Sequence, residues 1–152
     1  MLNQDFKDII SAFNAARVEY LLVGGYAVAA HGLPRATGDI DLWIRPTPEN
    51  AQRAWQALAD FGAPMERVSL VDLCRPDTVL QFGVVPGRID IVTSIEAVEF
   101  DDAWAAHLTV RLGDVVLPVI GRDHLLRNKR AVGRPQDLAD VARLEERQVD
   151  GD

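Results

Sequence analysis

The sequence predicts an α+β fold in which helices flank a mixed β-sheet. Apolar runs of strand length alternate with longer stretches whose apolar residues recur at helical spacing. Turn signals at Pro86-Gly87 and Gly113-Asp114 separate strand-like runs, so several strands are expected to pair antiparallel. The length of 152 residues favours one domain, which we place at residues 1–149 with a loose tail at residues 150–152.

The predicted helices rest on the spacing of their apolar residues. Phe6, Ile9, Ile10 and Phe13 form such a stripe near the start of the chain. Gly62 follows another periodic stretch and is a typical helix stop. The expected helices cover residues 4–16, 26–31, 48–61, 96–106, 123–132 and 136–147.

The predicted strands are short apolar runs bounded by glycine or proline. Gly24-Gly25 ends the first run, and Pro46 stops the second. Gly113-Asp114 joins the last two as a hairpin. The expected strands cover residues 18–23, 39–44, 68–73, 79–84, 88–93, 109–112 and 115–119.

Composition and charge narrow the class of protein. The formal net charge of −7 argues against broad, non-specific coating of nucleic acid, although it leaves room for a local phosphate site. Cys74 is the single cysteine, which excludes an intrachain disulfide and suits a reducing cytoplasm. The start, MLNQDFKDII, resembles no signal peptide, and no apolar run approaches the roughly 20 residues of a membrane span. We therefore expect a cytoplasmic protein with no membrane partner.

Two acidic residues stand on one predicted strand. Residues two apart in a strand point to the same face, so the side chains of Asp39 and Asp41 are expected to project together. Two desolvated carboxylates in this position repel each other and favour a divalent cation, and hard oxygen ligands favour Mg²⁺. The alternative is a pair of solvated acids on an exposed strand face.

The motif "RIDIVT" supplies a third acid, and a glycine pair precedes the first two. Asp90 lies between two isoleucines on another predicted strand, where it is either a site residue or an edge-strand acid paired with Arg88 or with a turn. Three carboxylates on adjacent strands could hold two metals about 3.5–4 Å apart, as in-line phosphoryl displacement requires. Gly24 and Gly25 would let a phosphate approach the backbone, although a plain tight turn is the alternative. The pair lacks the G-x-G-x-x-G spacing of a dinucleotide site.

These motifs together resemble a known group of enzymes. A G-G pair, thirteen intervening residues, D-I-D and a distant I-D-I are similar to the nucleotidyltransferase superfamily that includes polymerase beta and the minimal nucleotidyltransferases. The longer string "GGYAVAAHGLPRATGDIDL" resembles more narrowly the AbiEii-type proteins, the toxin half of some bacterial abortive-infection systems. The ending "LLRNKRAVGRPQDLADVARL" resembles the lysine-plus-acid motif of the same group.

The resemblance implies a fold, a site and partners. It implies a mixed sheet with helices on it, and a catalytic triad of Asp39, Asp41 and Asp90 that binds two Mg²⁺ ions, for which Mn²⁺ is expected to substitute. It implies that Gly24 and Gly25 hold the triphosphate of an incoming nucleotide. Members of the group transfer a nucleoside monophosphate to a hydroxyl of an RNA, a protein or a small molecule. We expect RNA, including tRNA, or a protein as acceptor here, and a toxin would have a cognate antitoxin protein as partner.

Three further residues are candidates for binding phosphate. Arg35 and Thr37 precede the D-I-D strand, where a guanidinium and a hydroxyl suit phosphate oxygens, or where they are a solvated cation and a turn cap. Lys129 shares the helix face of Leu125 and Leu126, which is unusual for a lysine unless it meets an anion. We expect that anion to be the triphosphate. The alternatives are a snorkelling lysine or an ion pair with the acids at positions 137 and 140.

The sequence leaves other functions open. Residues 122–134 carry five Lys and Arg residues and His124 against one acid, so they form either a polynucleotide-binding surface or a solvated helix face. Asp137 and Asp140 could orient Lys129 or Arg134 and are not assigned to catalysis. The main alternative to an enzyme is a catalytically silent module that binds a nucleotide or a partner, in the manner of an antitoxin. A receiver domain with paired acids is disfavoured because the repeated βα alternation is missing.

Overall fold

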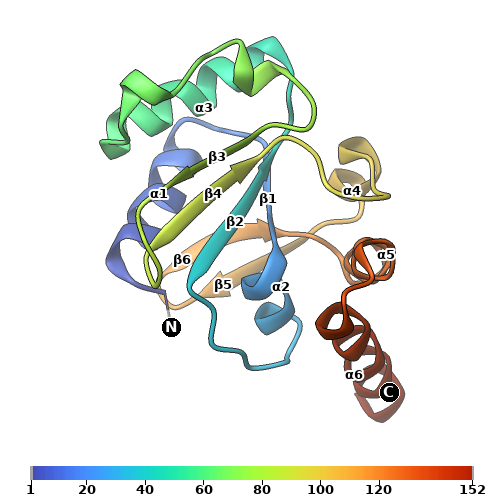
Figure 1. Cartoon of the computed structure of the whole chain (residues 1–152). Coiled ribbons are helices and arrows are strands. Elements are labelled where there is room, and N and C mark those ends of the chain that lie inside the picture. The colour runs from blue at the N-terminus through green and yellow to red at the C-terminus, as the bar shows by residue number, and fades with distance from the viewer. Residues whose placement is uncertain (1, 152) are drawn as a thin grey trace.

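A mixed six-stranded sheet with flanking helices forms the fold, as the sequence predicts (Figure 1). The computed structural model describes residues 2–151, with side chains described up to Arg147. The strands are β1 Tyr20–Val23, β2 Asp39–Ile44, β3 Val79–Phe82, β4 Arg88–Val92, β5 Leu108–Leu112 and β6 Val115–Val119. The helices are α1 Gln4–Ala15, α2 Gly24–Ala30, α3 Pro48–Phe61, α4 Phe100–Ala105, α5 Arg122–Val132 and α6 Pro135–Gly151.

The sheet combines antiparallel hairpins with parallel joins, in the order β3-β4-β2-β1-β6-β5. β1 pairs antiparallel with β2, while β2 pairs parallel with β4. In that parallel register Asp41 lies directly opposite Asp90, and Asp39 lies opposite Arg88. The middle of the sheet therefore brings charged residues from two distant parts of the chain to neighbouring positions.

Helices cover the apolar residues of the sheet. Phe6, Ile9, Ile10 and Phe13 of α1 are fully buried, which confirms the predicted stripe. In Figure 1, α1 and α3 lie together towards one end of the sheet, and α5 and α6 lie towards the other, beyond α2. None of the helices described over residues 2–151 is both long and apolar enough to span a membrane.

The strand expected at residues 68–73 is wrong. A 3-10 turn at Met65–Arg67 precedes this segment, and another at Asp72–Cys74 begins within it. Val68 and Leu73 are its buried residues, and because they stand five apart, they cannot point to one face of a strand whose side chains alternate. The apolar residues between them are exposed, so the run has no sheet neighbour to cover it.

The helix boundaries agree with the expectation to within two residues except at two ends. The helix expected at residues 96–106 begins only at Phe100, because Ala97 has a φ of 65°, which no right-handed helix accommodates. α6 is described as far as Gly151, and the rest of the tail expected at residues 150–152 lies outside the described residues.

A buried amide fastens β1, β2 and α3 together. Asn50 is 2% exposed, and its Oδ1 accepts a hydrogen bond of 2.7 Å from the backbone N–H of Glu19. Its Nδ2 donates to the carbonyl oxygens of Glu19 and Arg45, both at 2.9 Å. One side chain thus satisfies backbone groups just before β1 and just after β2, the strand that carries two of the three acids.

Asn50→Ala should destabilise the protein, because it removes the side-chain partner of the Glu19 N–H and of the Arg45 carbonyl, while the Glu19 carbonyl keeps its bond from the Arg45 N–H. We expect the free energy of unfolding to fall by about 2–4 kcal/mol, the cost of a few unsatisfied groups. Urea unfolding followed by circular dichroism measures this change. Gln56→Ala on the exposed face of the same helix is the control and should change the value by less than about 0.5 kcal/mol. Equal stability of the two variants would contradict the fastening role of Asn50.

Candidate active site

The structure brings Asp39, Asp41 and Asp90 together. The first two alternate with Ile40 along β2 and point to the same face, while Asp90 stands beside Asp41 on β4. Each offers a carboxylate oxygen, and these oxygens lie within 4.8 Å of one another. Asp90 is 5% exposed, whereas the other two are half-buried. β4 is an interior strand, so Asp90 is not an acid on a sheet edge.

The cluster is electrostatically unfavourable for Asp41. Burial, the negative charges of Asp39 and Asp90, and a hydrogen bond with Asp90 together raise the pKa of Asp41 from 3.8 to about 7, and Arg88 opposes the rise. At neutral pH and without a bound cation, this group is therefore close to its midpoint of titration. A divalent cation would remove that penalty, as expected for hard oxygen ligands.

Arg88 bridges two of the acids. Its Nε donates to Asp90 Oδ1 at 3.0 Å, and its Nη2 donates to Asp39 Oδ2 and Asp90 Oδ2, both at 3.2 Å. The pairing with Asp90 was the structural alternative for that acid, and it is present. Sequence reasoning missed the link to Asp39, although the two-residue spacing of Arg88 and Asp90 on one strand already places both on one face.

A cleft of about 540 Å³ opens over the acids. Its walls contain all the residues that the sequence proposed for the site, together with others from the same loop, from β4, and from the junction of α5 and α6 and the start of α6. The lining residues are Gly24, Gly25, Arg35, Ala36, Thr37, Gly38, Asp39, Asp41, Arg88, Asp90, Lys129, Arg134, Gln136 and Asp137. The acids therefore share one cleft with the glycine turn and with several cations.

The glycine turn needs glycine for space as well as for conformation. Gly24 has a φ of +71°, and a β-carbon at this position would collide with the Asp41 carboxylate. A β-carbon on Gly25 would lie 3.1 Å from Thr37 Oγ1. The turn therefore exposes backbone at the point where it meets the acids. Thr37 itself donates through Oγ1 to the carbonyl of Asp39 at 3.1 Å, so in this state it supports the loop.

The cations opposite the acids are held by two buried carboxylates. Lys129 is 6% exposed, and its Nζ lies 3.2 Å from Asp137 Oδ1 and 3.1 Å from Asp140 Oδ2. Arg35 pairs with Asp140 through both terminal nitrogens, Nη1 and Nη2. Arg134 Nε donates to Asp137 at 2.7 Å. The ion pair foreseen as the alternative for Lys129 is therefore present, and Arg35 is not a free loop cation. Contact of either residue with phosphate stays a prediction.

These pairings hold both carboxylates in the ionised form. A hydrogen bond from Arg134 lowers the pKa of Asp137 against the effect of burial, and Lys129 adds to it. Burial would raise the pKa of Asp140, but hydrogen bonds from Arg35 and Lys129 outweigh it, so that pKa is also lowered. Three cations around two anions leave one net positive charge on this wall of the cleft.

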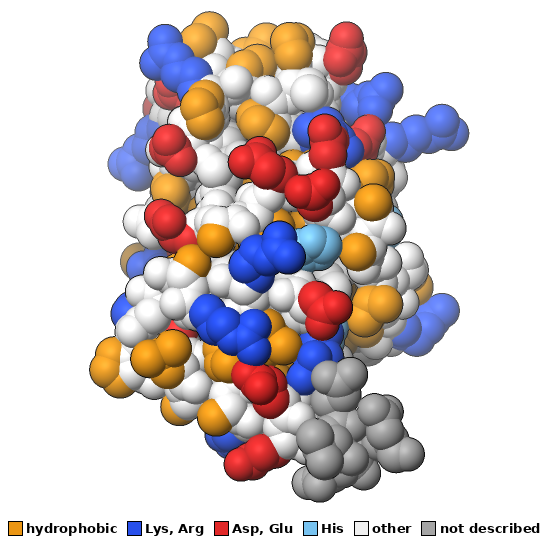
Figure 2. Space-filling view, turned by 90° about the vertical axis from the view of Figure 1, so that its right-hand side faces the viewer, with side chains coloured by type: hydrophobic (Ala, Val, Ile, Leu, Met, Phe, Trp, Pro, Cys, Tyr) orange, Lys and Arg blue, Asp and Glu red, His pale blue; other side chains and the backbone are white. Residues whose placement is uncertain are grey.

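The basic segment 122–134 does not form a continuous basic surface. Arg130 pairs with Glu145 at 2.6 Å, and within this segment the cleft lining includes only Lys129 and Arg134. Figure 2, which views the side of α4, α5 and α6, shows blue and red side chains interspersed on that face. Such alternation suits a solvated surface better than a track for a nucleic-acid backbone.

No protein-family model matches the chain, and no curated protein matches it either. Among solved structures, the chain is similar to the lincosamide antibiotic adenylyltransferase LnuA in its lincomycin-bound form, with a TM-score of 0.58. The two share 16% sequence identity over 95% of this chain and 97% of that one. The likeness shows that the chain has the fold of a nucleotidyltransferase. The closer resemblance to AbiEii-type proteins stays a prediction.

The raised pKa of Asp41 gives a stability difference that depends on pH. The folded state binds the proton of Asp41 more tightly than the unfolded state does. The stabilisation that this provides is fully present below pH 3.8 and is lost as the pH rises through about 7. Asp41→Asn cannot ionise and escapes this loss. In EDTA, the variant should gain about 1–3 kcal/mol relative to wild type between pH 5 and pH 8. Urea unfolding at both pH values measures it, with exposed Asp60→Asn as control, and a pH-independent difference would contradict the assignment.

Lys129→Met should destabilise the fold, because it leaves Asp137 and Asp140 with less compensation in a buried position. We expect a loss of about 3 kcal/mol in the free energy of unfolding, typical of breaking a buried ion pair. Arg130→Met on the same helix removes an exposed pair with Glu145 and should cost less than about 1 kcal/mol. If both variants unfold at the same urea concentration, the buried network contributes nothing to stability.

Proposed function

We propose that this protein is a Mg²⁺-dependent nucleotidyltransferase that moves a nucleoside monophosphate from a nucleoside triphosphate to an acceptor hydroxyl, with pyrophosphate as the second product. The observation that carries this proposal is the meeting of Asp39, Asp41 and Asp90 in one cleft whose opposite wall is cationic. The fold shared with an adenylyltransferase supports it. The sequence resemblance described above supports the same chemistry.

The acids fit a metal site. They are hard oxygen donors, close enough to share a cation, and burial together with the charges of Asp39 and Asp90 raises the pKa of Asp41, a penalty that a cation would relieve. We propose that all three carboxylates hold Mg²⁺, with two ions in total and Mn²⁺ as a substitute. Bound there, the metal would neutralise phosphate oxygens and lower the pKa of the acceptor hydroxyl.

The rest of the cleft would hold the triphosphate. Gly24 and Gly25 carry no side chain at the turn, so phosphate oxygens can approach the backbone. Lys129 has three N–H donors, and its two contacts to Asp137 and Asp140 leave one for a ligand. Arg134 and Arg35 add charge on the same wall, and Thr37 adds a hydroxyl. The fixed carboxylates behind these cations would keep them in place before the nucleotide arrives.

The nature of the acceptor is a further part of the proposal. The resemblance to AbiEii-type toxins supports RNA, including tRNA, or a protein, and with it a cognate antitoxin. The LnuA structure has lincomycin, a lincosamide antibiotic, bound, which supports a small-molecule acceptor. The interspersed charges around α5 and α6 also favour a small acceptor over a polynucleotide (Figure 2).

Substitution of Asp90 distinguishes an enzyme from a catalytically silent module that only binds a nucleotide. Binding of one metal–nucleotide complex needs only Asp39 and Asp41, whereas transfer also needs the acceptor oxygen activated in line. Asp90→Asn should therefore keep nucleotide affinity within a few fold while reducing transfer about 10²–10⁴-fold. Exposed Asp102→Asn is the matched control and should leave both unchanged.

The measurement combines calorimetric titration of nucleotide, with and without Mg²⁺, with single-turnover transfer of labelled nucleotide to RNA, protein and small-molecule acceptors. Nucleotide affinity that is the same with and without metal would contradict the metal site. If wild type binds Mg²⁺–nucleotide but transfers it to none of these acceptors, the silent module replaces the enzyme. If wild type transfers nucleotide and Asp90→Asn matches it, the triad is wrong.

A further inference from the structure

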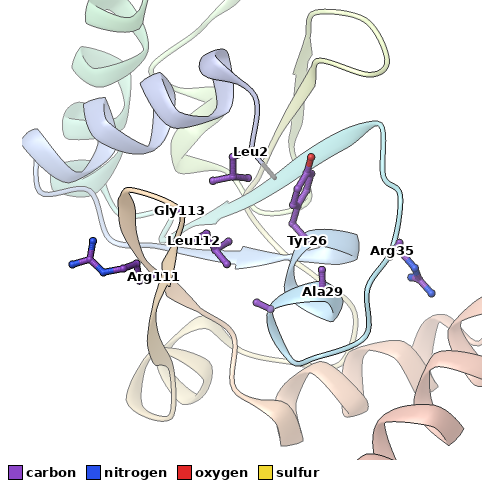
Figure 3. Close-up of a pocket in the computed structure, with 8 residues that line it drawn as sticks. Leu2, Tyr26, Ala29, Arg35, Arg111, Leu112 and Gly113 are labelled. Atoms are coloured by element: carbon purple, nitrogen blue, oxygen red, sulfur yellow. The ribbon is translucent and has the colours of Figure 1, made fainter.

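A second pocket of about 290 Å³ lies beside α2, on a different set of walls from the acidic cleft. Figure 3 shows it between α2, the turn that joins β5 and β6, and the start of the chain. Leu2, Leu112 and the ring of Tyr26 provide apolar surface, and Ala29 and Ala30 leave the space open because their side chains are small. Its size suits a group of one or two rings.

The pocket offers no charge to a ligand. Arg35 and Arg111 belong to its rim, but Figure 3 shows both guanidinium groups directed away from the centre. The guanidinium of Arg35 is directed to Asp140 of α6, away from this pocket. A phosphate or carboxylate in the pocket would therefore have no cation to meet, and an uncharged ligand fits best.

The pocket adjoins the acidic cleft through the first turn of α2. Arg35 contributes to the walls of both, and its Cδ lies 3.6 Å from the β-carbon position of Gly25. Tyr26 follows Gly25 directly in the chain, so it connects a residue of the cleft wall to the pocket that its ring lines. The edge of its ring also contacts Phe6, with centroids 5.6 Å apart, which fixes the wall. A ligand in the pocket would thus have Tyr26 between it and the acids.

We propose that this pocket binds the acceptor, and that the acceptor is an uncharged, ring-bearing alcohol whose hydroxyl extends past Tyr26 towards Asp39. This inference rests on the proposed nucleotidyl transfer. In that reaction the alcohol oxygen bonds to the α-phosphorus, and the bridging P–O bond to the β-phosphate breaks. Pyrophosphate leaves with that electron pair, and the hydroxyl proton passes to solvent through the carboxylates.

The donor's own base is a poorer occupant. A nucleobase has several hydrogen-bonding groups at its edges, and burying them without partners is costly. Among the side chains on the inner walls, only Tyr26 offers a polar group, a single hydroxyl. An alcohol with one hydroxyl and an apolar ring leaves fewer groups unpaired.

Benzyl alcohol is a suitable probe, followed by NMR of protein labelled at its alanine and leucine methyl groups. It should shift the signals of Ala29, Ala30 and Leu112 with or without a non-hydrolysable Mg²⁺–nucleotide analogue. Ala30→Leu should weaken its binding about tenfold or more by filling the pocket. Leu112→Trp fills the pocket from the opposite wall, in case the first variant folds poorly. Ala142→Leu, the same change on the exposed face of α6, is the control and should bind like wild type.

Two results would overturn the pocket as an acceptor site. One is the absence of methyl shifts with benzyl alcohol in folded wild type. The other is adenosine shifting the same methyl groups more strongly, or the nucleotide analogue displacing benzyl alcohol, because the pocket would then belong to the donor.

Mn²⁺ at the carboxylates tests the orientation of the probe. Its paramagnetism should relax the CH₂ protons of bound benzyl alcohol more than the ring proton farthest from the hydroxyl, and the reverse order would overturn the proposed direction. If Mn²⁺ does not bind, the proposed function fails and the acceptor role fails with it. The methyl titration would still report separately whether the pocket binds an alcohol.

Discussion

Repulsion among three carboxylates is the constraint on which the site depends. The parallel pairing of β2 and β4 places Asp41 opposite Asp90, and the two-residue repeat of the strand adds Asp39. All three positions lie on paired strands, so the backbone that carries the acids is held in place by the sheet. Positive charge must therefore come to the cluster, and Arg88 provides it within the chain. Strands β2 and β4 thus carry an excess of negative charge that a bound cation would neutralise.

The opposite wall of the cleft has the inverse arrangement. Lys129, Arg35 and Arg134 surround Asp137 and Asp140, so each charged side of the cleft already contains counter-charges of its own. A metal–triphosphate complex would exchange some of these internal contacts for contacts to itself. Binding would then replace existing ion pairs, and much of the charge would be positioned beforehand.

Local patterns predicted most of the fold and the residues that line the cleft, but not the ion pairs among them. The bounds of β2 and α3 agree with the sequence because strand alternation and a helix stop at Gly62 are local signals. The approach of Asp90 to Asp41 depends on a register between segments 49 residues apart, which spacing alone does not encode. The partners of Arg35 and Lys129 depend on where α6 packs, so the sequence left them as alternatives. The strand predicted at residues 68–73 is wrong because an apolar run forms a strand only where a neighbouring strand pairs with it.

The contacts of Asp140 restrict which substitutions the sequence of this protein can accept. This residue of α6 accepts a hydrogen bond from Arg35, in the loop before β2, and forms an ion pair with Lys129 of α5. Loss of this acid removes the ion pair of Arg35 and leaves Lys129 with Asp137 alone, and loss of one cation leaves the acid under-compensated. Substitutions at positions 35, 129 and 140 are therefore expected to co-vary among homologues. Such a three-way correlation would mark this arrangement of α6 in sequences that share little else.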